Sequence, residues 1–159
     1  MKEYYSRLKG EDMEIKSPVK GKIGTLASLK DGVFSAGFMG EGVIVTPEDN
    51  SIYAPISGRL VTVFPTGHAY GIVAKDGTAV LVHIGVDTVG LDGEGFTQLV
   101  KQGKKVKAGA KMAEVDFAAI KGKVPAIDVV VLVTPDSTTK VVKTNKGAVT
   151  PSDTILEVA

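Results

Sequence analysis

Two histidines stand fifteen residues apart in the segment TGHAYGIVAKDGTAVLVH, residues 66–83, and the chain has no others. Imidazole can act as a nucleophile, as an acid or base, or as a metal ligand near neutral pH. No cysteine is present to share that chemistry. The chemical question is therefore whether the fold brings His68 and His83 together.

The dipeptide Asp-Gly at 76–77 lies between two apolar runs and predicts a hairpin. A two-residue type I′ turn needs positive φ at both central positions, which this dipeptide tolerates. With that turn, Tyr70 lies opposite His83 and His68 lies opposite Gly85. Same-face diagonal neighbours have backbones roughly 7–8 Å apart, so the two imidazoles would meet. A three-residue loop would shift the register by one and move a histidine to the other face.

In the predicted register, one face of the hairpin holds both histidines in an apolar frame. That face consists of Thr66, His68, Tyr70, Ile72, Ala79, Leu81, His83 and Gly85. The alternate residues of the second strand, Val80, Val82, Ile84 and Val86, are expected in the core. Paired imidazoles titrate together, so one ring can stay neutral as a nucleophile while the other supplies a hydrogen bond or charge. The alternative is a pair of structural histidines that meet by chance.

Composition narrows the class of protein. The 159 residues fit one domain, 1–159, and 19 basic residues balance 18 acidic ones. Such a balance argues against nucleic acid or an anionic membrane as the main partner. We interpret the lysine-rich run at 101–111 first as a solvated surface and second as a rim for an anionic partner. The start is charged, no apolar run reaches about 20 residues, and cysteine is absent, so we expect a cytoplasmic protein without membrane insertion.

Glycine and proline punctuate the whole chain, and short apolar runs lie between them. The runs expected to form strands are 42–46, 59–64, 79–86, 128–133 and 154–158. This pattern predicts an all-β fold, an antiparallel β-sandwich or barrel-sandwich with one or two very short helices. The helical candidate is 95–102, GFTQLVKQ, where apolar residues recur at helical spacing. The similar decapeptides SPVKGKIGTL (17–26) and APISGRLVTV (54–63) suggest two related hairpins.

Residues 54–96 resemble the glucose-type IIA domain of the bacterial phosphotransferase system. The family motif Thr-x-His-Ala corresponds to residues 66–69, and the second motif, His-x-Gly-x-Asp-Thr-Val-x-Leu-x-Gly-x-Gly-Phe, is complete at 83–96. The family-like core covers about 17–133, after an N-terminal extension at 1–16, and the C-terminal residues 140–159 match less clearly. Ala79 departs from the family, because many members have Glu there.

The resemblance implies a phosphocarrier of the sugar phosphotransferase system. Such a domain takes a phosphoryl group from a small histidine phosphocarrier protein and passes it to the IIB domain of a membrane sugar permease. The implied site consists of His83 as acceptor through Nε2, His68 as assisting residue, Thr66 to orient His68, Asp87 at the rim and Gly85 beside the active ring. The implied docking surface comprises Val33, Phe34 and Phe64, to which the hairpin face adds Tyr70, Ile72 and Leu81.

The same resemblance implies neither a cofactor nor a metal, because the second imidazole supplies the donor and the charge. Regulatory protein targets are a further expectation, since the family also serves as a binding domain. Met1 and the short tails favour a free-standing carrier over a piece of a permease. The sugar is left open.

Three other functions compete. A zinc hydrolase could use His68, His83 and Asp87 as ligands, although no His-Glu-x-x-His motif and no third histidine occur. A swinging-arm carrier could use Lys75 at the hairpin tip, with APISGRL similar to a stretch of biotinyl and lipoyl domains. A purely regulatory binding domain could use the same apolar face. Nucleotide binding is set aside, because the glycine-rich stretch 32–42 has no P-loop ending.

Overall fold

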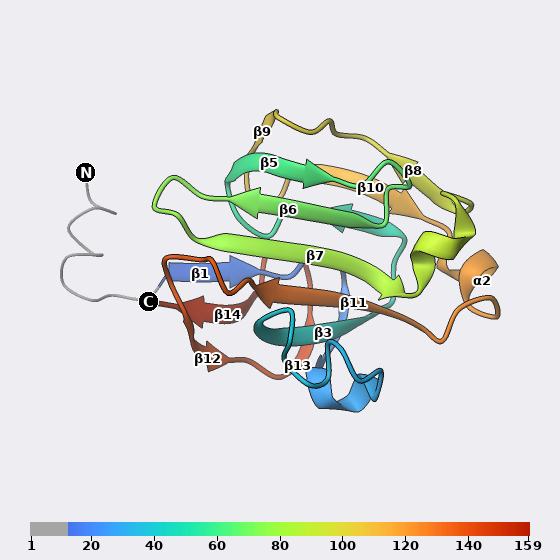
Figure 1. Ribbon diagram of the computed structural model, residues 1–159, viewed down its shortest axis with the longest axis horizontal. Helices are drawn as coiled ribbons and strands as arrows, with labels where there is room; N and C mark the ends of the chain where they lie inside the picture. The colour runs from blue at the N-terminus through green and yellow to red at the C-terminus, as the bar shows by residue number, and fades with distance from the viewer. Residues whose placement is uncertain (1–12) are drawn as a thin grey trace.

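The computed structural model describes residues 13–159, whose regular secondary structure is almost entirely antiparallel strands (Figure 1). The strands are β1 Met13–Lys16, β2 Gly21–Thr25, β3 Glu41–Pro47, β4 Ser51–Tyr53, β5 Gly58–Val63, β6 Ala69–Val73, β7 Ala79–Val86, β8 Phe96–Gln98, β9 Lys105–Val106, β10 Lys111–Val115, β11 Ala126–Val133, β12 Val141–Thr144, β13 Gly147–Val149 and β14 Thr154–Val158. Helical turns form at η1 Leu26–Leu29, η2 Thr88–Leu91 and α2 Phe117–Ile120. The predicted all-β class with very short helices is confirmed.

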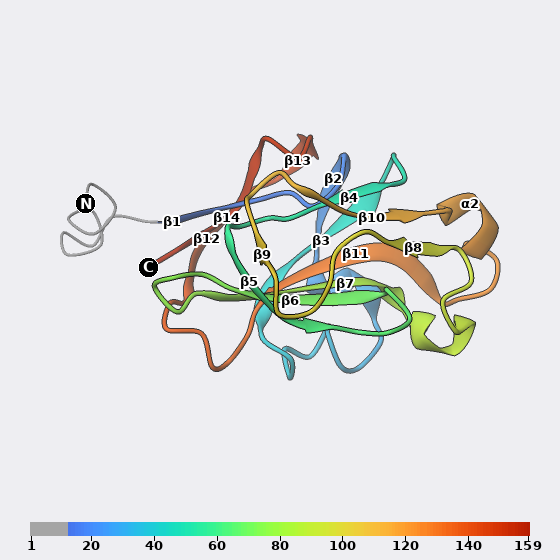
Figure 2. The same ribbon diagram turned by 90° about the horizontal axis from the view of Figure 1, so that it is seen from above.

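The strands form one large sheet and two small ones. The eight-stranded sheet has the order β13-β2-β3-β11-β7-β6-β5-β9, and the small sheets are β4-β10-β8 and β1-β14-β12. The small sheets lie on one side of β5, β6, β7 and β11 (Figure 2). The main core fills the space between the layers, with fully buried side chains such as Leu60, Ile72, Ile84, Met112 and Leu156. The predicted sandwich is therefore observed, with the outer face of β7 turned away from its core.

Each of the five apolar runs forms a strand, except that Phe64 lies just after the end of β5, and β7 has the predicted bounds Ala79–Val86. Its inward residues Val80, Val82, Ile84 and Val86 are buried, as expected. The predicted helix at 95–102 is wrong, because β8 occupies Phe96–Gln98. Phe96 pairs with Val115 of β10 and packs against the main core, so strand pairing outweighs a short helical pattern.

The turn between β6 and β7 differs from the prediction. The N–H of Ala74 donates to Thr78 at 2.8 Å and the N–H of Gly77 donates to Ala74 at 2.9 Å, so the loop has three residues, 75–77. Positive φ occurs at Gly77 alone (90°), and the carboxylate of Asp76 instead accepts the N–H of Thr78 at 2.9 Å. This is the three-residue loop with a glycine bulge rather than a type I′ turn. The predicted register is therefore wrong by one residue.

The corrected register changes the exposure of β6. Ala69 lies opposite His83, and Tyr70 and Ile72 lie opposite Val82 and Val80. Tyr70 and Ile72 consequently point into the core, where both are 0% exposed. Their predicted place on a docking surface is wrong for that reason.

The termini of the described part belong to the same fold. Of the extension expected at 1–16, residues 1–12 lie outside the described part, and 13–16 form β1. The C-terminal segment supplies β12, β13 and β14, and Ile155, Leu156 and Val158 are fully buried. The similar decapeptides lie side by side, because the N–H of Tyr53 donates to Pro18 at 2.7 Å and that of Lys16 donates to Pro55 at 3.0 Å.

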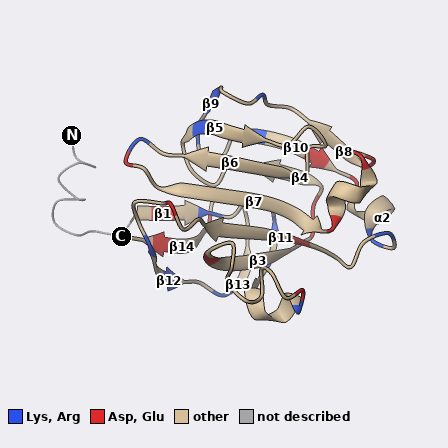
Figure 3. Cartoon of the chain, viewed as in Figure 1, with Lys and Arg blue, Asp and Glu red and all other residues tan. Residues whose placement is uncertain are grey.

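Charge is unevenly distributed over the sheet. Neither β6 nor β7 contains a charged residue, whereas lysines gather at 101–111, around β9 (Figure 3). The five lysines of that run are all exposed, which agrees with the predicted solvated surface. Among the helices of residues 13–159, none is long and apolar enough to cross a membrane.

Candidate functional site

His83 lies on the outer face of β7, between the inward side chains of Val82 and Ile84. Its Nδ1 atom is 2.7 Å from the carbonyl oxygen of Gly85. A carbonyl can only accept a hydrogen bond, so Nδ1 must carry the proton. In the neutral ring, Nε2 therefore has the lone pair, which is the state that a nucleophilic imidazole requires.

His68 meets His83 in spite of the changed register. The two ring centroids are 5.1 Å apart and the rings are inclined by 78°. His68 precedes the first residue of β6 and follows Gly67, whose φ is 76°. Because His68 stands outside the regular strand, strand alternation does not fix the direction of its side chain. The predicted contact between the imidazoles is therefore present, although the predicted reason for it was wrong.

Two neighbours hold the ring of His68. The hydroxyl oxygen of Thr66 is 2.5 Å from Nδ1 of His68, and the ring of Phe64 packs edge-on at a centroid distance of 5.0 Å. His68 is only 1% exposed, so this ring has little freedom. If the hydroxyl of Thr66 donates, Nε2 of His68 carries the proton and can donate to a substrate. The orienting role of Thr66 stays a prediction, and the geometry suits it.

The pKa of each imidazole lies below the ordinary value of a histidine. Burial, and secondarily the nearby His83, lowers the pKa of His68 to about 4. Burial also lowers the pKa of His83, although the Gly85 carbonyl and the carboxylates of Asp31 and Asp87 act in the opposite direction. A lowered pKa favours the neutral form of His83, whose lone pair can act as a nucleophile.

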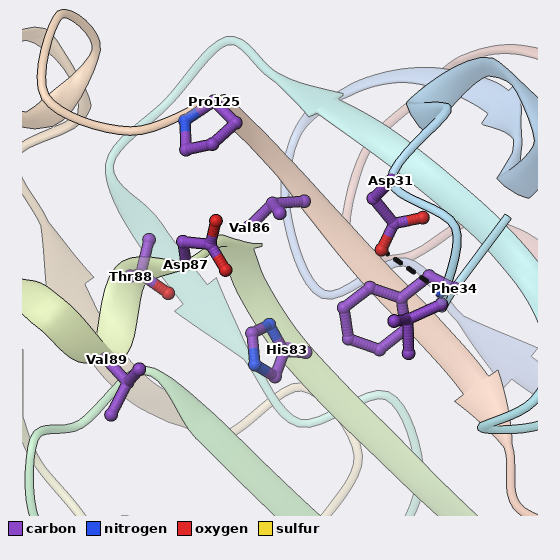
Figure 4. Close-up of a pocket in the computed structure, with 9 residues that line it drawn as sticks. Asp31, Phe34, His83, Val86, Asp87, Thr88, Val89 and Pro125 are labelled. Atoms are coloured by element: carbon purple, nitrogen blue, oxygen red, sulfur yellow. Dashed lines mark hydrogen bonds between the residues drawn. The ribbon is translucent and has the colours of Figure 1, made fainter.

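A pocket of 330 Å³ opens beside His83 (Figure 4). It is lined by Asp31, Val33, Phe34, His83, Val86, Asp87, Thr88, Val89 and Pro125. The loop between η1 and β3 thus faces the segment that follows β7. Asp87 lines the pocket with φ of 59°, and its role at the site stays a prediction; the hydroxyl of the buried Thr88 donates to the carbonyl of Ile84 at 2.6 Å. The lining contains carboxylates but no lysine or arginine.

Asp31 lines the pocket beside His83, and the sequence analysis did not single it out. Its carboxylate accepts the N–H groups of Phe34 at 3.0 Å and Ser35 at 2.9 Å. Burial raises the pKa of Asp31, but the donors from Ser35 and Phe34 outweigh it and lower the pKa below its ordinary value. An aspartate followed by glycine, as at 31–32, is typical of a turn in which the carboxylate accepts nearby backbone N–H groups. Val86 and Val89 were also missed.

The predicted docking residues divide into three groups. Val33 and Phe64 are 47% and 40% exposed, and Leu81 is partly exposed, so these three can meet a partner. Phe34 is only 8% exposed and contacts His83 instead. Tyr70 and Ile72 belong to the core, as the register requires.

The competing functions find less support in this geometry. His68, His83 and Asp87 do not assemble as zinc ligands, and residues 13–159 contain no group of three metal-ligating side chains that could hold an ion. Lys75 does lie exposed at the tip of the β6–β7 loop, where a swinging arm would need it.

Known proteins resemble this chain over most of its length. The glucose-specific EIIA component of Mycoplasma capricolum is 44% identical over 117 residues, which are 74% of this chain and 76% of that protein. The glucose-specific EIIA component of Bacillus cereus is 35% identical over 139 residues, which are 87% of this chain and 84% of that protein. The beta-glucoside-specific EIIBCA component of Bacillus subtilis is 45% identical over 107 residues, 67% of this chain and only 18% of that larger protein.

A solved structure agrees with these relatives. The glucose permease IIA of Mycoplasma capricolum superposes with a TM-score of 0.88 at 38% identity, over 92% of this chain and 96% of that one. Residues 13–139 also match the model of one family, described as phosphoenolpyruvate-dependent sugar phosphotransferase system, EIIA 1. With this fold, these paired histidines and these relatives, the chain belongs to the EIIA 1 family of the phosphoenolpyruvate-dependent sugar phosphotransferase system.

Proposed function

We propose that His83 is the residue on which this EIIA component carries the phosphoryl group. Members of the family are phosphotransferase components with a phosphohistidine intermediate, and this chain has only two histidines. His68 is 1% exposed, whereas His83 is partly exposed and lines the pocket. The hydrogen bond from Nδ1 of His83 to Gly85 carries the proposal, because it leaves Nε2 as the nucleophile.

The phosphoryl group passes through this protein in two successive displacements at phosphorus. The lone pair on Nε2 of His83 attacks the phosphorus of a phosphohistidine on the small histidine phosphocarrier protein, and the donor's N–P bond breaks as the new one forms. A cysteine thiolate of the IIB domain then attacks the phosphorus, and the electron pair returns to His83. His68 donates a hydrogen bond to the phosphoryl oxygens, with Thr66 orienting it. Phosphoryl transfer asks a protein mainly for such positioning and charge stabilisation.

The surface around His83 suits two successive protein partners. Val33, Phe64 and Leu81 expose apolar area beside the site, and neither β6 nor β7 carries charge. A largely apolar surface can dock different proteins in turn, and the charged groups beside His83 are the carboxylates of Asp31 and Asp87. We propose that the small phosphocarrier and the IIB domain of a sugar permease use it in the cytoplasm, and that any regulatory target competes for it. The names of the relatives include glucose and beta-glucoside systems, and the sugar of this chain stays open.

The test is phosphorylation with phosphoenolpyruvate, the general phosphotransferase enzyme and the small carrier protein. His83→Ala is expected to abolish labelling, because the nucleophile is lost. His68→Gln is expected to accept the group but to stop its passage to a IIB domain, because the hydrogen-bonding partner of the phosphoryl group changes. Mass spectrometry of an alkaline digest locates the base-stable, acid-labile phosphate. A phosphate found on His68, or normal onward transfer by His68→Gln, would contradict the assignment.

A further inference from the structure

The loop between η1 and β3 carries four large apolar side chains with different surroundings, Val33, Phe34, Phe38 and the 42% exposed Met39. Val33 is 47% exposed and Phe38 is 75% exposed, whereas Phe34 is only 8% exposed. Exposed apolar side chains at a site are available to a partner, but a buried one is not. Phe34 therefore needs an explanation other than docking.

Phe34 is fixed by a small cluster outside the main core. Its ring packs with Ile44, Val130 and Leu132 on the outer face of β3 and β11. The backbone beside it is held as well, because its N–H donates to Asp31 at 3.0 Å and its carbonyl accepts the N–H of Gly37 at 3.1 Å. The position of this aromatic ring is therefore determined by packing and by hydrogen bonds at once.

The fixed ring lies against the imidazole of His83. The two ring centroids are 5.0 Å apart at an angle of 56°, and both side chains line the pocket (Figure 4). His68 contacts the same imidazole at 5.1 Å, and Gly85 accepts the hydrogen bond of its Nδ1. His83 is thus held by Phe34, His68 and a backbone carbonyl, and its Nε2 has no hydrogen bond to any other residue of 13–159.

We propose that Phe34 is a positioning residue that holds His83 in its reactive orientation and keeps water from the phosphoryl group carried there. This inference rests on the proposed role of His83 as carrier. The competing reaction is hydrolysis: the oxygen of water attacks phosphorus, the P–Nε2 bond breaks and its electron pair returns to the imidazole. Inorganic phosphate leaves with the water's oxygen, and a proton passes to solvent. The ring of Phe34 forms one wall of the pocket and so denies water an approach from that side of the imidazole.

Three substitutions of Phe34 and one matched control test this role. Phe34→Ala removes the ring, Phe34→Leu keeps apolar volume without a ring, and Phe34→Tyr keeps the ring. Phe38→Ala removes the same ring from an exposed position of the same loop. Each full-length protein is phosphorylated with phosphoenolpyruvate, the general enzyme and the small carrier. It is then freed of these proteins, and the loss of phosphate at pH 7 is followed over time.

The expected rate of hydrolysis depends on whether position 34 keeps an aromatic ring. Phe34→Ala should lose its phosphate about tenfold faster than the unsubstituted protein, with Phe34→Leu about threefold faster. Phe34→Tyr and Phe38→Ala should hydrolyse at nearly the natural rate. Nitrogen NMR of the unphosphorylated proteins gives a second readout, the fraction of His83 protonated at Nδ1. That fraction should fall in Phe34→Ala, and the pKa of His83 should rise because burial lowers it in the natural protein.

The outcomes separate this inference from the proposed function. If Phe34→Ala carries phosphate on His83 with unchanged hydrolysis and an unchanged Nδ1 fraction, the role of Phe34 is wrong and the carrier assignment stands. If the unsubstituted protein carries no phosphate on His83, the carrier assignment fails first. Circular dichroism and thermal unfolding check each variant. Should Phe34→Ala not fold, Phe34→Leu decides, and a natural hydrolysis rate in that variant overturns the proposal.

Discussion

The carbonyl oxygen of Gly85 lies 2.7 Å from Nδ1 of His83, a side chain two residues earlier on the same strand. In a regular strand, a side chain does not donate a hydrogen bond to a carbonyl of its own strand, because these carbonyls point sideways to the neighbouring strands. Gly85 has φ of 75°, and this left-handed turn at the end of β7 directs its carbonyl to the imidazole. One backbone position therefore selects the tautomer of the proposed nucleophile.

Substitution of Gly85 tests that relationship. A Cβ atom there would lie 2.6 Å from Cγ2 of Thr88 and 2.9 Å from the carbonyl oxygen of Ala126, at a φ that L residues rarely adopt. Gly85→Ala should lower the free energy of unfolding by about 1–3 kcal/mol and reduce labelling of His83 in the folded protein. Urea unfolding and the phosphorylation assay measure the two effects. The matched control is Gly90→Ala, because nothing lies within 4 Å of that Cβ. If Gly85→Ala and Gly90→Ala have the same free energy of unfolding and the same labelling of His83, the carbonyl of Gly85 does not orient that imidazole.

The hydroxyl of Thr66 offers a test of the second imidazole. Thr66→Val keeps the shape of the side chain but removes the group that lies 2.5 Å from Nδ1 of His68. We expect acceptance of phosphate by His83 to persist, while transfer to a IIB domain slows by about tenfold or more, because His68 loses its fixed tautomer. Thr66→Ser should restore much of the rate. Stopped-flow transfer assays separate the two steps, and an unchanged second step in Thr66→Val would show that Thr66 does not act through His68.

Much of the fold could be predicted because its strands are short, apolar and bounded by glycine or proline. The run at 79–86 coincides with β7, since it is a continuous apolar stretch between clear turn signals. The helix predicted at 95–102 was wrong, because three apolar residues at helical spacing also fit a short strand that pairs with β10. The local pattern alone cannot distinguish a helix from a strand here, because the strand forms by pairing with β10, which comes later in the sequence.

The contact between the two histidines was predicted, but the register behind it was not. His68 and His83 meet, yet the register that was meant to bring them together was off by one residue, because positive φ occurs at Gly77 and not at Asp76. A dipeptide alone does not distinguish a two-residue turn from a three-residue turn with a bulge. Asp31 was missed for a related reason: its place beside His83 depends on how the loop before β3 folds over the sheet.

The depressed pKa of His68 predicts a dependence of stability on pH. The native pKa is about 4, whereas an unfolded histidine titrates near 6.5. Between these values the unfolded chain binds the proton and the native protein does not, so the free energy of unfolding rises with pH. The contribution is complete above pH 6.5 and is lost as the pH falls toward 4, with a difference of about 2 kcal/mol between pH 7 and pH 5.

His68→Gln isolates that contribution, because the carboxylates titrate in both proteins. Urea unfolding at pH 5, 6 and 7 should show a smaller loss of stability on acidification in His68→Gln than in the unsubstituted protein. The carboxylates of Asp31 and Asp87 act on His83, so their effect is common to the two proteins. Parallel stability curves would mean that His68 titrates in the native protein as it does in an unfolded chain.

The hydroxyl of Tyr70 should cost stability. Tyr70 is 0% exposed, burial raises its pKa to about 12, and its hydroxyl has no hydrogen-bond partner among residues 13–159. A buried polar group without a partner costs about 1–3 kcal/mol, so Tyr70→Phe should raise the free energy of unfolding by about 1 kcal/mol. Tyr53→Phe, at a partly exposed position, is the matched control and should change it by less than about 0.5 kcal/mol. Urea unfolding of the three proteins gives the comparison. A loss of stability in Tyr70→Phe alone would show that the hydroxyl is hydrogen-bonded in solution, for instance to an internal water beneath Gly67.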